Sequence, residues 1–329
     1  MRIFSGIQPT GRKTFGNYSG GFRQYAATQE QGEAFFCIVD LHSITVEHDP
    51  DELRRSTLDL AAMLFATGID PARSTVFAQS HNPAHAEAAW LLSASTSFGE
   101  LRRMTQFKDK SDAHEFVSAG LFTYPVLMAG DVLLYQTDIV PIGDDQRQHM
   151  ELTRDVAQRF NARYGETFTV PRGVYPDTGA RIMDLTDPEK KMSTSTSSDM
   201  GKVLIIDPPD VIRKKIMSAV TDTGREVRRA PDKPGITNLI DMMSVATGAD
   251  PADIEREYEG LGYGRFKADV AEALTACLTP IQQRFQEVRA DQAELERVLA
   301  QGARKAIETS RPTLQAMYDR MGFTRRTLD

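Results

Sequence analysis

Residues 4–17 have the sequence FSGIQPTGRKTFGN, and the fold of the whole chain is organised around them. An apolar run leads into Ser5 and Gly6, and a helical pattern begins where the stretch ends. Strand, glycine-rich turn and helix start together are typical of a nucleotide site, because a helix N-terminus offers unpaired N–H groups and a positive dipole end to phosphate. The stretch matches neither the dinucleotide fingerprint nor the P-loop. Its glycines therefore leave two interpretations open, a surface for a nucleotide or a tight strand-to-helix turn.

Length and composition set the class of protein. A chain of 329 residues can form two domains and a large core. Its hydrophobic content of 40% and charged content of 26% are those of an ordinary soluble protein, and no apolar run approaches the ~20 residues of a membrane span. Met1 leads directly into a strand, so we expect no signal peptide. Cys37 and Cys277 indicate reduced core thiols of a cytoplasmic protein, and we expect no metal site. The net charge of −7 means that a nucleic-acid partner would need a local basic patch.

The first half of the chain alternates short apolar runs with helical patterns. We expect strands at residues 2–5, 34–39, 74–78 and 139–142. Asp49-Pro50 marks a helix start and Gly68 a helix end, and a later helix carries His149, Leu152, Val156 and Phe160 on one stripe. This order predicts a doubly wound parallel sheet of α/β class. Gly6, Asp40 and Gly143 follow strands, so they should converge at the carboxyl edge of the sheet, where ligands bind.

The second half is helical in pattern. Residues 209–299 show no strong strand signal, and a last helical stretch runs from 291 to 321, where Pro312 should bend or break it. We therefore expect a Rossmann-like domain over residues 1–187, an all-helical domain over 188–298 and a C-terminal helical segment over 299–329, packed back on the first domain. A basic run lies in the second domain and contains Lys214, Lys215, Arg225, Arg228, Arg229 and Lys233. A solvated helix face is the commoner explanation of such a run, and a nucleic-acid surface is the alternative.

Two short motifs, far apart in the sequence, carry a family resemblance. Thr14-Phe15-Gly16-Asn17 resembles the HIGH-type signature of class I aminoacyl-tRNA synthetases, most closely the TIGN form of the bacterial tryptophanyl-tRNA synthetases. Residues 191–195, KMSTS, resemble KMSKS, the second class I signature, whose mobile loop holds the ATP phosphates. Alone, this polar stretch would be read as a flexible linker. It departs from the family pattern at Thr194, where a hydroxyl replaces a lysine and one positive charge near the pyrophosphate is lost.

The resemblance implies a set of nucleotide-binding residues. Lys191, Lys110, Thr14, Asn17 and Gln8 would stabilise charge on the phosphates, with Lys110 or Lys190 compensating for Thr194. The expected ATP contacts are Gln8, Pro9, Thr10, Gly16, Asn17, Gly143, Asp144, Asp145, Ile182, Lys191, Met192, Ser193, Thr194 and Ser195. Two neighbouring aspartates by themselves suggest a metal site or a helix cap. We expect Asp144 to cap the following helix, Asp145 to hold the ribose and Ile182 to lie against adenine.

A lone carboxylate in an apolar helix indicates the second ligand. Asp131 follows the apolar residues 124–130 and needs a partner, since an unpaired buried acid is costly. A helix cap or a structural hydrogen bond would satisfy it. The resemblance implies instead that it accepts the indole N–H of tryptophan, which is a donor only. The expected tryptophan pocket contains Phe4, Gly6, His42, Tyr124, Met128, Asp131, Val140, Ile142 and Gln146.

The resemblance implies a tryptophan–tRNA ligase. Such an enzyme activates L-tryptophan with ATP, which brings Mg²⁺, to the adenylate and pyrophosphate, and then transfers tryptophan to tRNA(Trp). The family is homodimeric and cytoplasmic, with no DNA or membrane partner, and residues 188–298 would be the anticodon-binding domain. Two alternatives remain: a catalytically weakened paralogue that binds tryptophan or tRNA, for which Thr194 is the support, and a tyrosyl-specific relative.

Overall fold

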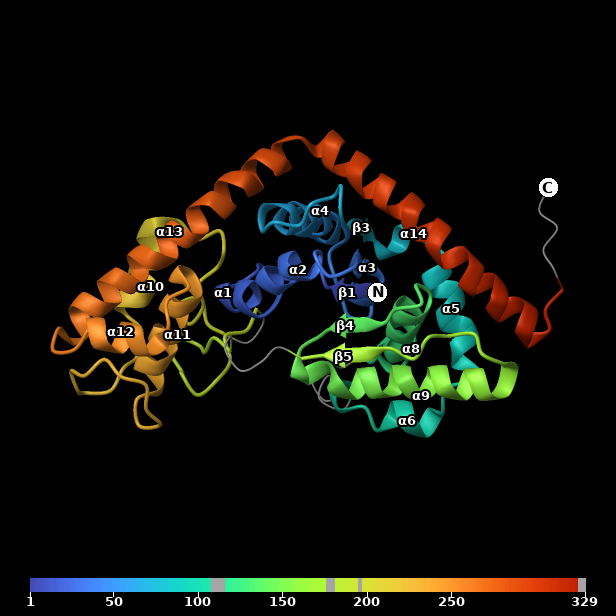
Figure 1. Ribbon diagram of the computed structural model, residues 1–329, viewed down its shortest axis with the longest axis horizontal. Helices are drawn as coiled ribbons and strands as arrows, with labels where there is room; N and C mark the ends of the chain where they lie inside the picture. Colours follow the sequence, from blue (N-terminus) through green and yellow to red (C-terminus); the bar gives the residue numbers. More distant parts are fainter. Residues whose placement is uncertain (108–115, 176–180, 195–196, 325–329) are drawn as a thin grey trace.

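A five-stranded parallel sheet forms the centre of the molecule (Figure 1). The computed structural model describes residues 1–107, 116–175, 181–194 and 197–324. The strands are β1 (Arg2–Ile7), β2 (Glu33–Ile38), β3 (Thr75–Ala78), β4 (Ile139–Pro141) and β5 (Arg172–Val174). Their order is β3-β2-β1-β4-β5, and each neighbouring pair runs parallel. The expected doubly wound α/β sheet is confirmed, and β5 is a strand that the sequence pattern did not indicate.

Helices cover both faces of this sheet. They are α1 (Phe15–Asn17), α2 (Arg23–Thr28), α3 (Asp40–Ser43), α4 (Pro50–Ala66), α5 (Ala84–Ser93), α6 (Phe98–Arg102), α8 (Ala119–Leu133) and α9 (Arg147–Tyr164), with a π-helical turn at Tyr18–Phe22 and 3₁₀ turns at Gln79–His81 and Asp144–Gln146. Strand β2 is apolar along its length because alternate residues enter two cores. Phe36 and Ile38 pack into one core, and Phe35 and Cys37 pack into the other.

Local signals set several helix ends. The side chain of Asp49 accepts a hydrogen bond from the Glu52 N–H at 2.8 Å and caps α4, which closes near Gly68 with a φ of +105°. Helix α9 begins later than expected, at Arg147, because residues 144–146 form a 3₁₀ turn, and Gln146 occupies its N-cap position without a side-chain cap bond. The side chain of Asp144, which was expected to cap this helix, lies outside the described residues.

The second half of the chain is helical, as expected. Its helices are α10 (Pro209–Met217), α11 (Pro234–Thr247), α12 (Pro251–Glu257), α13 (Gly262–Ala290) and α14 (Gln292–Met321). Helices α13 and α14 form a long arch over the sheet, and α14 packs on β3, α4 and α5 (Figure 1). A break at Pro312 does not occur, since α14 continues through it. Burial of Ser310 and Thr313 on either side of the proline holds the helix against the sheet domain.

The basic run is not a uniform surface. Lys215 is 2% exposed and its ammonium lies 2.8 Å from the Asp207 carboxylate, which also accepts from the Leu204 N–H. Lys233 is buried against Asp222 at 2.9 Å. These two lysines form buried ion pairs within the helical part, so they do not belong to a nucleic-acid surface. In the described parts of the chain, no helix combines the length and apolar character that crossing a membrane requires.

Candidate active site

A cavity of about 280 Å³ lies at the carboxyl edge of the sheet. Every residue expected in the amino-acid pocket lines it: Phe4, Gly6, His42, Tyr124, Met128, Asp131, Val140, Ile142 and Gln146. Gln8 and Gly143, expected at ATP, line it as well. The parallel sheet brings these residues together because β1 and β4 are neighbours whose ends open on the same side. That they bind an amino acid remains a prediction.

Some lining residues were missed by the sequence analysis. They are Tyr25, Val39, Thr45, Gln106, Val132 and Pro141. Val39 and Pro141 lie at or just past strand ends, so strand position could have indicated them, whereas no local signal marks Tyr25 or Thr45. Asp40 is not among the lining residues. Its carboxylate accepts from the N–H and O–H of Ser80 and ties α3 to the 3₁₀ turn at Gln79–His81.

Apolar walls and a few polar groups give the cavity its character. Tyr124 donates to the Gln106 Oε1 at 3.2 Å and contacts the His149 Nε2 at 2.8 Å. Burial raises the pKa of Tyr124 to about 12, so its hydroxyl keeps its proton at neutral pH. Gln146 donates to the Asp145 carboxylate at 2.7 Å. The combination of flat apolar walls with a small number of held polar groups is that of a small-molecule site.

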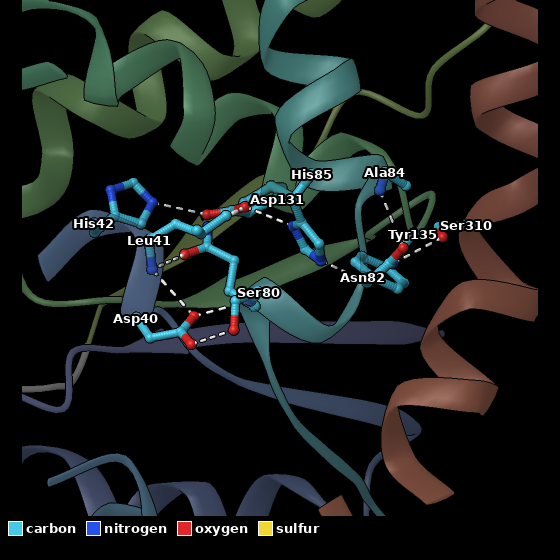
Figure 2. A network of polar contacts seen from close by, with 12 residues as sticks. Asp40, Leu41, His42, Ser80, Asn82, Ala84, His85, Asp131, Tyr135 and Ser310 are labelled. Atoms are coloured by element: carbon cyan, nitrogen blue, oxygen red, sulfur yellow. Dashed lines mark hydrogen bonds and ion pairs between the residues drawn. The ribbon is translucent and has the colours of Figure 1, made fainter. Parts of the chain in front are cut away.

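Asp131 is the most constrained group in the cavity. Its carboxylate is 2% exposed and receives three hydrogen bonds, from Gln79 Nε2 at 2.6 Å, His85 Nδ1 at 2.6 Å and His42 Nε2 at 2.9 Å (Figure 2). Burial acts to raise the pKa of Asp131, but the hydrogen bonds from His42 and His85 outweigh it and hold that pKa well below its usual range. Asp131 is therefore an ionised group that can only accept. A carboxylate offers about four acceptor positions, so one is left for a ligand.

The two signature motifs lie against each other in the fold. Thr14 and Asn17 form a capping box, in which the Thr14 N–H donates to the Asn17 Oδ1 at 2.8 Å. The Thr194 hydroxyl donates to the same Asn17 oxygen at 3.1 Å. The Phe15 N–H donates to the Val203 carbonyl at 2.7 Å. The structure thus joins two stretches that lie far apart in sequence.

Gly11 is the point of closest approach between these stretches. It has a φ of +69°, and a Cβ placed there would lie 2.2 Å from the Thr194 Cγ2. A side chain at this position is therefore opposed by the backbone conformation, and it would force the Thr194 side chain to move.

Two lysines that the sequence analysis missed lie at this junction. Lys202 is half-buried and donates to the carbonyls of Thr194 and Ser197, both at 3.1 Å. Lys13 donates to the carbonyls of Gln8 and Thr10 at 2.7 and 2.9 Å, and burial lowers its pKa to about 8. No motif distinguishes either lysine from the many others in the chain.

The remaining predicted residues are distributed as follows. Lys191 is exposed, and Lys190 is exposed and pairs with Asp187 at 2.7 Å. Ile182 and Met192 are buried in the core and do not line the cavity. Pro9, Thr10, Gly16 and Ser193 also lie outside its lining. Lys110, Ser195 and the side chain of Asp144 lie outside the described residues.

Comparisons with known proteins point in one direction. The family model described as class I tRNA synthetases (W and Y) matches residues 1–279. The chain is 52% identical to the tryptophan–tRNA ligase of Clostridium tetani over 322 residues, which cover 98% of this chain and 95% of the relative. Its fold matches the crystal structure of tryptophanyl-tRNA synthetase from Mycoplasma pneumoniae with a TM-score of 0.86 and 36% identity, covering 100% and 99% of the two chains. The Campylobacter jejuni synthetase complexed with ADP and tryptophan also matches with a TM-score of 0.86, at 32% identity, covering 98% and 100%.

Replacement of Gly11 by alanine should separate the two signature stretches. We expect Gly11→Ala to destabilise this region by about 1–3 kcal/mol, because both the backbone conformation and the Thr194 contact oppose a Cβ. Trypsin should then cleave faster at Lys191 and Lys202. Gly248→Ala is the matched control, since Gly248 also has a positive φ, of +78°, but no atom within 4 Å of the added Cβ. Equal cleavage of the two variants would contradict the contact.

Proposed function

Because the chain belongs to the class I tRNA synthetases, and among them to the tryptophanyl-tRNA synthetases of bacterial type, we propose that it is a tryptophan–tRNA ligase. The observation that carries this proposal is a cavity with one ionised, acceptor-only carboxylate, Asp131, at the sheet edge. An indole N–H is a donor without acceptor capacity, so it matches the one free position on that carboxylate.

In the first step, a carboxylate oxygen of tryptophan attacks the α-phosphate of ATP. The new O–P bond forms as the bond to pyrophosphate breaks, which gives tryptophanyl-adenylate. Phe4, Met128, Val140 and Ile142 hold the indole, while Tyr124 and Gln146 face the amino acid. These residues position the substrate, and the rate depends on how precisely they do so.

The phosphates lie against the junction of the two signature stretches. Gln8, Thr14 and Asn17 offer donors from one side, and Lys191 adds a cation from the other. Mg²⁺ enters bound to ATP as part of the substrate. Gly143 and Asp145 hold the ribose end. The side chains of Ile182 and Met192 are buried, so these residues would contact adenine through their main chain.

In the second step, the tryptophanyl group passes from the adenylate to the 2′-hydroxyl of the terminal ribose of tRNA(Trp), and AMP leaves. We assign the sheet domain to residues 1–187, the anticodon-binding domain to residues 188–298, and a return segment to residues 299–329. Exposed basic residues in the second part include Arg213, Lys214, Arg225, Arg228 and Arg229.

A homodimer would cover apolar side chains near α5 and α6. Trp90 is 79% exposed, Phe98 69% and Phe116 83%, which is unusual for large aromatic residues on a monomer. Phe98 contacts Phe122 of α8 with ring centroids 5.0 Å apart, so the patch is continuous with a core helix. We place the second copy here and the enzyme in the cytoplasm, where ATP and tRNA are available.

The function is tested by the exchange of pyrophosphate into ATP. We expect exchange with tryptophan and none with tyrosine. Asp131→Asn should raise the KM for tryptophan by about 100-fold with little change in the KM for ATP, because the amide presents a donor where an acceptor is needed. Asp40→Asn is the control, since Asp40 is an acidic residue of the same edge outside the cavity. Equal loss for both substrates would make Asp131 a structural residue only.

The weakened-paralogue alternative is tested at Thr194. Lys202 already places an ammonium 3.1 Å from the Thr194 carbonyl, so we expect Thr194→Lys to change adenylate formation little. Lys202→Met should slow single-turnover adenylate formation about tenfold, as loss of one well-placed cation near the phosphates predicts. Adding Thr194→Lys to Lys202→Met should then recover part of the rate. A Lys202→Met variant with the full rate would contradict this role.

Contact with tRNA is tested by removing Arg228 and Arg229. Arg228 pairs with Glu226 and Asp232, and Arg229 pairs with Asp241, so part of their charge is already neutralised. We expect the double alanine variant to lower tRNA charging about tenfold at low salt, and less at high salt, with adenylate formation intact. Arg54→Ala, which removes an exposed and ion-paired arginine from α4 in the sheet domain, is the control. Unchanged charging would leave these arginines as solvated surface residues.

A further inference from the structure

A buried chain of polar side chains runs from the cavity to the C-terminal helix α14. His85 is fully buried on α5 and joins two groups: its Nδ1 lies 2.6 Å from Asp131 Oδ1, and its Nε2 lies 2.9 Å from the Tyr135 hydroxyl. Beyond Tyr135 the chain continues to Asn82 and to Ser310 of α14 (Figure 2). His85 does not line the cavity, so any effect on a ligand must pass through Asp131.

The polar chain has a direction, which begins at a backbone group near its outer end. The Ala84 N–H donates to the Asn82 Oδ1 at 3.2 Å, which fixes the orientation of the Asn82 amide. The Asn82 Nδ2 therefore faces outward and donates to the Tyr135 hydroxyl oxygen at 3.0 Å and to the Ser310 Oγ at 3.1 Å. The amide has no freedom to flip, because the flipped form would place two donors against each other at Ala84.

The same direction continues through Tyr135 into His85. The Tyr135 oxygen accepts from Asn82 and keeps one hydrogen to donate, and the His85 Nε2 lies within reach of it at 2.9 Å. Burial raises the pKa of Tyr135 well above its usual range, so this hydroxyl keeps its hydrogen. The His85 Nδ1 lies 2.6 Å from the Asp131 carboxylate, which can only accept, so Nδ1 carries a proton, and a neutral imidazole then offers its Nε2 to the Tyr135 hydroxyl as an acceptor.

We propose that His85 is a positioning residue for substrate selection, held by Tyr135 and Asn82 in the tautomer that keeps Asp131 an acceptor for the indole N–H. This inference rests on the proposed function and deepens it. Three donors hold the carboxylate: Gln79 and His85 share Oδ1, and His42 takes Oδ2. The remaining lone pair of the ionised Asp131 carboxylate therefore keeps a fixed direction. Removing the Nδ1–H leaves Oδ1 with one donor fewer, and the carboxylate can rotate or accept a proton.

The consequence is a specificity effect that depends on one hydrogen atom of the ligand. Tryptophan donates its indole N–H to Asp131, whereas β-(benzothien-3-yl)alanine has a sulfur at that position and donates nothing. Both ligands fill a flat apolar cavity in the same way. A defect in the Asp131 acceptor should therefore weaken the binding of tryptophan and leave the binding of the analogue unchanged. A general loss of packing should weaken the binding of both ligands.

Three variants test the assignment. His85→Gln moves the side-chain amide to the level of Nε2 and removes the donor to Asp131. His85→Asn is the conservative variant, because its amide nitrogen lies near the position of Nδ1. Tyr135→Phe keeps the ring and removes the hydroxyl that the His85 Nε2 contacts. The dissociation constants of tryptophan and the analogue are measured by calorimetry, together with the KM and kcat for tryptophan in pyrophosphate exchange and the Tm of each variant.

We expect His85→Gln to weaken the binding of tryptophan about 10- to 100-fold and the binding of the analogue less than about threefold, as loss of a partner to a buried charged group predicts. His85→Asn should keep tryptophan binding within about threefold of that of the wild type. Tyr135→Phe should weaken tryptophan binding by about three- to tenfold. The effect should appear in KM more than in kcat. Equal weakening of both ligands, or unchanged tryptophan binding in His85→Gln, would overturn the assignment while the proposed function stands. A wild-type protein that binds neither ligand would overturn both.

Discussion

The buried carboxylate of Asp131 is the constraint on which the rest of the site depends. A negative charge that is 2% exposed is tolerated only because three donors surround it, from the turn after β3, from α5 and from the segment after β2. Each donor comes from a different element. The two carboxylate oxygens of Asp131 therefore hold those three elements in position relative to α8. The fold is built to present an ionised acceptor at the edge of the sheet.

A second constraint is the contact between the two signature stretches. Gly11 and Thr194 approach so closely that a Cβ on Gly11 would displace the Thr194 side chain, and Asn17 shares one amide oxygen between Thr14 and Thr194. Replacement of the family lysine by threonine shortens the side chain, which suits this contact. Lys202, from the segment that follows, donates to the Thr194 carbonyl. In the proposed function, this lysine supplies the positive charge that Thr194 lacks.

The sequence predicted those parts of the site that follow strands. Gly6, Val140 and Ile142 could be placed in one cavity because the ends of parallel strands meet at one edge. Asp131 stood out because an acid in an apolar helix requires partners. Its actual partners could not be identified in advance, since Gln79 and His85 lie about 50 positions away and carry no local signal. Pro312 shows the opposite error, in which a strong local rule was overridden, because α14 continues through the proline while it is buried against the sheet domain. The 3₁₀ turn at residues 144–146 likewise delays the start of α9 to Arg147.

The central claim is that Asp131 accepts the indole N–H of tryptophan bound in this cavity. Nuclear magnetic resonance of tryptophan labelled with ¹⁵N at the indole nitrogen observes that proton directly. The account predicts one bound indole resonance, shifted downfield by a hydrogen bond to an ionised carboxylate and protected from exchange with water. A bound resonance with the shift and exchange rate of free tryptophan would contradict it, because the indole would then occupy the cavity without this hydrogen bond.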